Sequence, residues 1–226
     1  GTQGLKTISL KTFNDGDITL GTPGTSGLPD LQNINSIALI ASQNGNITLG
    51  DLGATTSINK ISSLSMTTEG GTISIGNIKA KKIDAINASG NEFSSISIGN
   101  IEISEAIDLI TLNGDASITL GNFTGDGTVK LDASNMTKMG INLNFSALQG
   151  SVDVTSTGED DIISLGIEAG KVISGGGNDN IIVAANATGN SDITTGDGVD
   201  IITLSAQSGI DIVEPGGTNV NINNKT

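Results

Sequence analysis

The chain has 226 residues and carries 24 acidic residues against ten lysines, a formal net charge of −14 at pH 7. This charge repels nucleic acid and anionic membrane surfaces, so cations are the expected small partners. The sequence contains no Cys, no His and no Arg. It therefore has no disulfide framework, no thiolate or imidazole metal ligand, no histidine general base and no guanidinium clamp for phosphate. We expect no enzymatic activity.

The apolar residues point to an all-β class. Aromatic residues make up only 2% of the chain, with four Phe and no Trp or Tyr, so large buried rings cannot anchor the core. Instead, Ile, Leu, Val and Ala alternate with Ser, Thr, Asn and Gly, which suits a half-buried strand. The sequence has no apolar run of about 20 residues and no signal-peptide pattern. It begins GTQG, and we expect it to be a piece of a longer protein.

One short phrase recurs along the chain. It reads DITLG, NITLG, TISIG, SISIG and SITLG, and its copies end at Gly21, Gly50, Gly76, Gly99 and Gly121. The interval shortens from 29 to 22 residues. Further copies follow at 141–144, 162–166, 181–185 and 201–205. A repeat of this period is typical of a solenoid, in which each repeat stacks on the one before it.

Each phrase follows a second short strand and a turn, as in IALIAS-QNG-NITLG over 37–50. Alternation places Ile47 and Leu49 on one face of the strand, so stacking aligns Ile with Ile and Leu with Leu. We predict a right-handed parallel β-solenoid. The alternative is a twisted β-sandwich built from hairpins. The near-constant period and the shortage of aromatic residues argue against the sandwich.

The turns change along the chain. The early turns include QNGN, TEGG and LNGD. Asp15, Asp17 and Asp115, which lie in early turns, are expected to be turn formers. From residue 155 the turns read TSTGEDDII, SGGGNDNII and TGDGVDIIT. Aligned on their acid, these three turns contain Gly158-Glu159-Asp160, Gly177-Asn178-Asp179 and Gly198-Val199-Asp200.

These last turns resemble the repeats-in-toxin (RTX) family, whose nonapeptide is G-G-x-G-x-D-x-U-x, with U a large aliphatic residue. Residues 174–182 and 195–203 each lack only the first Gly of that motif, 155–163 is a weaker copy, and 207–211 looks like a degraded one. The resemblance implies a calcium β-roll. On it, the candidate metal residues are Gly158, Asp160, Gly175, Gly177, Asp179, Gly196, Gly198, Asp200 and Asp211.

The chemistry of calcium agrees with that resemblance. Calcium binds six to eight carboxylate and carbonyl oxygens, and glycine turns expose their carbonyls. Three stacked carboxylates repel one another unless a cation neutralises them. We therefore predict one continuous stack with two parts: residues 1–150 without metal turns, and residues 151–226 with calcium along one edge only. A single Asp in a glycine turn can also be only a turn former.

Together these features predict a structural segment of a secreted bacterial surface (S-layer) protein that self-assembles in the presence of calcium. The resemblance is to RTX-type S-layer proteins, which are acidic, lack cysteine and leave the cell by type I secretion. The expected location is extracellular, with calcium and other copies of the chain as partners and no membrane insertion. One alternative is the stalk of an RTX adhesin or passenger-type protein. A third is a polysaccharide-modifying β-helix enzyme, although the chain lacks the basic and aromatic residues that grip an acidic sugar.

Overall fold

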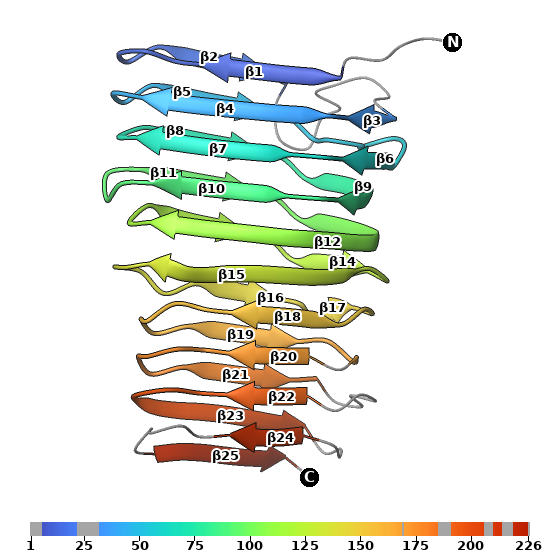
Figure 1. The fold of residues 1–226 in the computed structure, drawn as a ribbon, viewed down its shortest axis with the longest axis vertical. Helices are drawn as coiled ribbons and strands as arrows, with labels where there is room; N and C mark the ends of the chain where they lie inside the picture. The colour runs from blue at the N-terminus through green and yellow to red at the C-terminus, as the bar shows by residue number, and fades with distance from the viewer. Residues whose placement is uncertain are drawn as a thin grey trace.

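The computed structural model describes residues 6–21, 32–168, 170–184, 191–205, 210–213 and 219–225, with side chains described up to residue 204. The chain winds as a stack of flattened coils from its N-terminal end to its C-terminal end (Figure 1). Each coil sends one strand along the front and returns along the back. Three parallel sheets result.

The front sheet has a main path, on the near side in Figure 1, that contains one strand from each coil. Its main path is β1 (Thr7–Lys11), β4 (Ser36–Ser42), β7 (Leu64–Glu69), β10 (Ile86–Gly90), β12 (Ile101–Gly114), β15 (Thr128–Met136), β18 (Val152–Thr155), β20 (Gly170–Ile173), β22 (Ser191–Thr194) and β24 (Ile210–Val213). Five strands extend this sheet on one side: β3 (Asn33–Ile34), β6 (Ile58–Ile61), β9 (Ile78–Ile83), β14 (Phe123–Gly125) and β17 (Ala147–Leu148).

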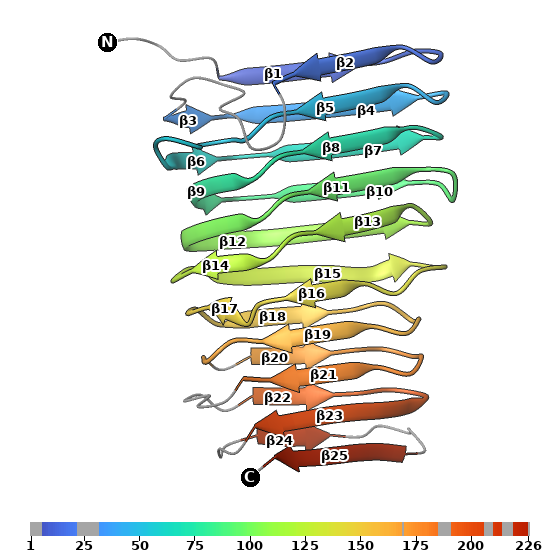
Figure 2. The same ribbon diagram turned by 180° about the vertical axis from the view of Figure 1, so that it is seen from behind.

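Two smaller sheets form the back of the stack and face the viewer in Figure 2. The upper back sheet contains β2 (Asp17–Leu20), β5 (Asn46–Leu49), β8 (Thr72–Ile75), β11 (Ser95–Ile98) and β13 (Ser117–Leu120). The lower back sheet contains β16 (Asn142–Asn144), β19 (Ile162–Leu165), β21 (Asn180–Val183), β23 (Val199–Ser205) and β25 (Asn219–Lys225).

Every strand pair among the described residues is parallel, which confirms the predicted solenoid and excludes the hairpin sandwich for this part of the chain. The near strands run leftward in both views while the chain descends, so the coil is right-handed (Figures 1 and 2). No helix that could cross a membrane is found in the described ranges.

The core consists of aliphatic columns, as the repeated phrase predicts. Ile47 pairs in register with Ile18 and Ile73, and Leu49 pairs with Leu20 and Ile75. Ile47 and Leu49 are fully buried. Such columns need no aromatic rings, because identical branched side chains pack on one another at each rung. Of the four Phe, only Phe123 and Phe145 lie in the core, with their ring centroids 4.7 Å apart.

The stack is continuous across residue 150, where the sequence predicts a change of turn type. Strand β15 pairs with β18, and β16 pairs with β19. The two predicted parts therefore share one run of parallel strands. They differ in the composition of their turns, which is where the candidate site lies.

Candidate metal site

The three glycine-rich turns predicted to bind calcium stack on one edge of the solenoid. Each one joins a front strand to the next strand of the lower back sheet, between β18 and β19, β20 and β21, and β22 and β23 (Figure 1). The strands on both sides of these turns pair in order, β18–β20–β22 in front and β19–β21–β23 behind. The turns must therefore follow one another rung by rung.

The strand register determines which acids share a column. Ile163 pairs with Ile181, and Ile181 pairs with Ile202. Two positions before these isoleucines stand Asp161, Asp179 and Asp200, separated by 18 and 21 residues. All three are almost completely buried, with 1%, 1% and 0% of their surface exposed. We call these three residues the aspartate column.

Asp160, the acid predicted from the sequence, lies outside this column. It is exposed, and its Oδ1 accepts a hydrogen bond from the backbone N–H of Asn178 at 2.6 Å. The alignment on Gly158 was therefore wrong by one residue. The distance that the three turns share is instead four residues, from Thr157 to Asp161, from Gly175 to Asp179 and from Gly196 to Asp200. Gly175 approaches the Thr157 carbonyl, and Gly196 approaches the Gly175 carbonyl.

Each acid of the column ties its own coil to the coil before it. Asp161 Oδ1 accepts the N–H of Ile141 at 2.7 Å. Asp179 Oδ1 accepts the N–H of Asp161 at 2.9 Å, and Asp200 Oδ1 accepts the N–H of Asp179 at 3.0 Å. Hydrogen bonds to charged groups are stronger than neutral ones. These hydrogen bonds therefore link successive coils even without a metal.

The second carboxylate oxygen separates the first turn from the next two. In the first turn, Thr157 donates its N–H to Asp161 Oδ2 at 3.0 Å and its hydroxyl to Asp161 Oδ1 at 2.9 Å. The later turns have Gly175 and Gly196 in place of Thr157, so this hydroxyl is missing. Asp179 Oδ2 and Asp200 Oδ2 are buried and have no hydrogen-bond partner.

Each of the three turns has a buried hydroxyl side chain directly before Thr157, Gly175 or Gly196. The hydroxyl oxygens of Ser156, Ser174 and Thr195 are all buried and lack a hydrogen-bond partner. A buried polar atom without a partner costs free energy, about 1–3 kcal/mol each. Unsatisfied oxygens therefore accumulate in the second and third turns, where two carboxylates also lie.

Burial raises the pKa of Asp179 to about 6, and the charges of Asp161 and Asp200 add to this effect. The Ser174 hydroxyl and the N–H of Asp161 act in the opposite direction. The Ser174 hydroxyl lies near the carboxyl but outside the geometry of a normal hydrogen bond. The middle acid of the column therefore carries its negative charge at a free-energy cost that a proton or a metal cation would relieve.

Four glycines are required by the close approach of successive turns. A Cβ on Gly175 would lie 1.8 Å from the Thr157 carbonyl oxygen, and one on Gly177 would lie 2.5 Å from the Glu159 carbonyl carbon. A Cβ on Gly196 or Gly198 would lie 1.6 or 1.8 Å from the carbonyl oxygen of Gly175 or Gly177. The carbonyls of Gly175 and Gly177 thus face the next turn.

Two other predicted residues do not join this arrangement. A Cβ on Gly158 would meet no atom within 4 Å, so neither packing nor a positive φ requires glycine there. Asp211 lies in β24 of the front sheet, in register with Asp192, and so is not part of the turn edge. The side chain of Asp211 and residues 207–209 lie outside the described part of the structure.

The oxygens of the second and third turns fit calcium in kind. They are two carboxylates, two hydroxyls and glycine carbonyls, the hard ligands that calcium prefers. Within the described ranges, no group of three or more acidic side chains could hold one metal ion. An ion here would therefore be bound by Asp179 and Asp200 together with neutral oxygens, rather than by three carboxylates.

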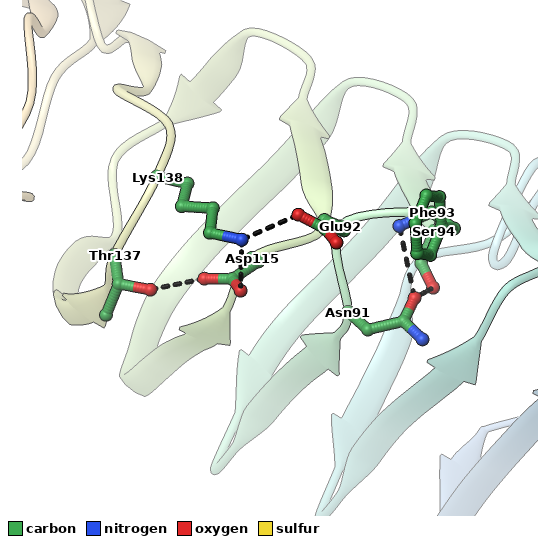
Figure 3. Close-up of polar contacts among 7 residues, drawn as sticks. All are labelled: Asn91, Glu92, Phe93, Ser94, Asp115, Thr137 and Lys138. Carbon is green, nitrogen blue, oxygen red and sulfur yellow. Dashed lines mark hydrogen bonds and ion pairs between the residues drawn. The ribbon is translucent and has the colours of Figure 1, made fainter.

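Higher on the same edge, a lysine side chain supplies the positive charge that pairs with the acids of the turns. Lys138 Nζ lies 2.6 Å from Glu92 Oε2 and 3.4 Å from Asp115 Oδ2, and Thr137 donates its hydroxyl to Asp115 (Figure 3). The bond to Glu92, followed by that to Asp115, raises the pKa of Lys138. We call Glu92, Asp115 and Lys138 the lysine clamp. It joins three successive turns, because a lysine from the third turn pairs with one acid from each of the two turns before it.

Lysine is scarce beyond the clamp. Residues 1–138 contain thirteen acids and eight lysines, a net charge of −5, whereas residues 139–226 contain eleven acids and two lysines, a net charge of −9. The ion pairs among the described residues all use Lys60, Lys79, Lys82, Lys130 or Lys138. No described ion pair involves an acid of the aspartate column.

A groove of about 420 Å³ lies beside the upper coils, on the opposite side from the glycine turns. A ladder of hydrogen bonds runs along it, in which Asp51, Asn77 and Asn100 each accept the backbone N–H of the corresponding residue in the next coil. Besides Asp51, the groove contains two charged side chains, Lys79 and Glu102. They form an ion pair at 2.9 Å. The polar and charged groups named here are therefore already paired within the protein.

The fold and the turns define the chain as a parallel β-solenoid with an internal column of carboxylates. Comparisons with models of protein families, with curated proteins and with solved structures found no match.

Proposed function

We propose that this chain is a structural segment of a secreted, calcium-dependent bacterial surface layer, in which calcium neutralises the lower turns of a β-solenoid. The observation that carries the proposal is the pair of buried, unpartnered carboxylate oxygens on Asp179 and Asp200. Each of these acids follows a glycine turn, and the carbonyls of Gly175 and Gly177 face the next coil. The similarity of these turns to RTX nonapeptides agrees with the same metal.

The composition supports a structural role. The chain has no His, Cys or Arg, so the usual nucleophile–base pairs and phosphate clamps are missing. A rod made of repeated rungs provides long, regular surfaces suited to assembly. Outside the cell, calcium at millimolar concentration would bind weak sites of this kind, whereas the low cytosolic concentration would leave the lower coils less ordered for export.

The direct test is calcium titration calorimetry on the metal-free chain, with Asp179→Ala and a matched control, Asp160→Ala. Asp160 is exposed and outside the column, so its removal should leave calcium affinity nearly unchanged. Removal of Asp179 should weaken binding at least tenfold. Absence of calcium binding by the wild-type chain, or equal losses in the two variants, would contradict the proposal.

A further inference from the structure

The first of the three glycine-rich turns contains a threonine at the position where the other two contain glycine. Thr157 stands four residues before Asp161, as Gly175 stands four residues before Asp179. The two positions are adjacent in the stack, because a Cβ on Gly175 would lie 1.8 Å from the Thr157 carbonyl oxygen. Gly175 has φ +100, whereas Thr157 has no positive φ. The first turn therefore accommodates a side chain where the second turn requires glycine.

The Thr157 side chain closes the first turn on itself. Its hydroxyl donates to the Asp161 carboxylate, with Oγ1 2.9 Å from Oδ1 and 3.1 Å from Oδ2. Its backbone N–H donates to Asp161 Oδ2 at 3.0 Å, and its Oγ1 accepts the N–H of Glu159 at 3.0 Å. Oδ1 of Asp161 also accepts the N–H of Ile141. Both carboxylate oxygens of this buried acid are thus bonded to donors within the protein.

The second and third turns leave a carboxylate oxygen without a donor. Asp179 Oδ2 and Asp200 Oδ2 are buried and have no hydrogen-bond partner, and the hydroxyl oxygens of Ser174 and Thr195 in the same turns also lack one. In the first turn, the hydroxyl oxygen of Ser156 lacks a partner too, but it carries no charge. The first turn therefore differs from the other two in its carboxylate, which is fully bonded.

We infer that the Thr157 hydroxyl takes the place of a calcium ion in the first turn, so that among these three turns calcium is bound only from the second onward. The inference rests on the proposed calcium site at Asp179 and Asp200. Calcium binds carboxylate oxygens directly. In the first turn, O–H and N–H donors already direct their positive ends at both oxygens of Asp161, so an ion would have to displace these bonds.

The backbone around Asp161 is otherwise arranged like that of the turns below it. Asp179 Oδ1 accepts the N–H of Asp161 at 2.9 Å, and Asp200 Oδ1 accepts the N–H of Asp179 at 3.0 Å. The pair of Asp161 and Asp179 thus repeats the link between Asp179 and Asp200 and lacks only the unbonded oxygen. Glycine at position 157 would remove the hydroxyl and could also adopt the positive φ of Gly175. This substitution should therefore open a further calcium site.

The test is calcium titration calorimetry of the full chain, starting from the metal-free protein. Thr157→Gly should bind one ion more per chain than the wild type. Thr157→Ala also removes the hydroxyl but keeps an ordinary backbone, and it should gain the same ion at lower affinity. The matched control is Thr157→Ser, which keeps the hydroxyl and should bind as the wild type does. The double variant Thr157→Gly, Asp161→Asn should lose the added ion. A β spectrum of each variant checks that it is folded.

The outcomes separate this inference from the proposed function. A wild type that binds calcium, together with folded Thr157→Gly and Thr157→Ala variants that bind no further ion, would overturn the inference and leave the proposed function standing. A further ion in Thr157→Ser, or one that persists in the double variant, would also overturn it, because the hydroxyl or Asp161 would then not decide binding. Calcium binding by Thr157→Gly but not by the wild type would support the role of Thr157 and contradict the proposed function. Absence of binding in every chain would contradict both.

Discussion

The upper and lower coils share one fold, but they neutralise the acids of their turns differently. In the upper coils, Lys138 holds Glu92 and Asp115 in the lysine clamp. In the lower coils, the aspartate column has no described lysine partner, and two of its oxygens lack any partner. An exposed ion pair contributes little stability, whereas a buried, unpaired carboxylate costs much more. The lower coils are therefore the part of this rod whose stability can depend on an added cation.

The largest expected effect comes from the glycines that allow the lower turns to stack. Gly177→Val should destabilise the lower coils by about 4 kcal/mol, because the valine backbone must keep a positive φ and its Cβ must overlap the backbone of the turn before it. Gly177 has φ +97, and its Cβ would meet the Glu159 carbonyl carbon at 2.5 Å. Urea unfolding would measure the loss.

The control for that variant is Gly158→Ala. This position has open space around a Cβ and no positive φ, so the substitution should change stability by less than about 0.5 kcal/mol. Equal losses at positions 158 and 177 would show that close stacking of the turns does not explain the glycines.

The next effect reverses its sign with calcium. Asp179→Asn keeps an oxygen that accepts the N–H of Asp161 but removes a buried charge. The metal-free variant should therefore be more stable than the wild type at pH 7.5, by up to about 3 kcal/mol. In calcium it should be less stable than the wild type, because the bound ion stabilises only the wild type. Thermal unfolding in EGTA and in calcium would measure the two changes. A change in the same direction under both conditions would contradict calcium binding at Asp179.

The pH dependence of the metal-free chain follows from the raised pKa of Asp179. In the folded chain this pKa is about 6, against 3.8 in the absence of the fold. Between these values the folded state binds more protons than the unfolded state, so stability falls as the pH rises from about 4 to about 6 and then levels off. The difference between wild type and Asp179→Asn isolates this group. A difference that does not vary with pH would contradict the raised pKa.

The smallest effect is expected at the lysine clamp. Lys138→Met removes the cation from Glu92 and Asp115, but all three side chains are partly or largely exposed. Water and salt already screen such charges, so the urea midpoint should move slightly, and less in high salt than in low salt. The change should be the same in EGTA and in calcium. A calcium-dependent change would mean that the upper and lower coils are not independent in this respect.

The sequence predicted the fold well because the fold depends on a repeated pattern. The period and the alternation of ITLG-type phrases fix both the parallel pairing and the burial of residues such as Ile47 and Leu49. The corners were also predicted in kind, although in the QNG turn the positive φ angles fall on Gln43 and Asn44 rather than on the glycine.

The site was predicted less completely, for physical reasons. The turn GEDD offers two adjacent acids, and only the strand register decides that Asp161 and not Asp160 points inward. The role of Thr157 was missed because it requires a hydroxyl four residues before the acid, a relation visible only once the turn is folded. The exposure of Ile162, Ile182 and Ile201 was missed because a pair of isoleucines is typical of a core strand, although one member of each pair must face outward.

Hydrogen exchange with and without calcium tests the central claim most directly. Removal of calcium should increase amide exchange in the strands around the aspartate column, β18 to β23, and should leave the upper strands β4 to β13 unchanged. Protection that stays the same everywhere, or that is lost equally in the upper and lower coils, would contradict a calcium requirement confined to the lower turns.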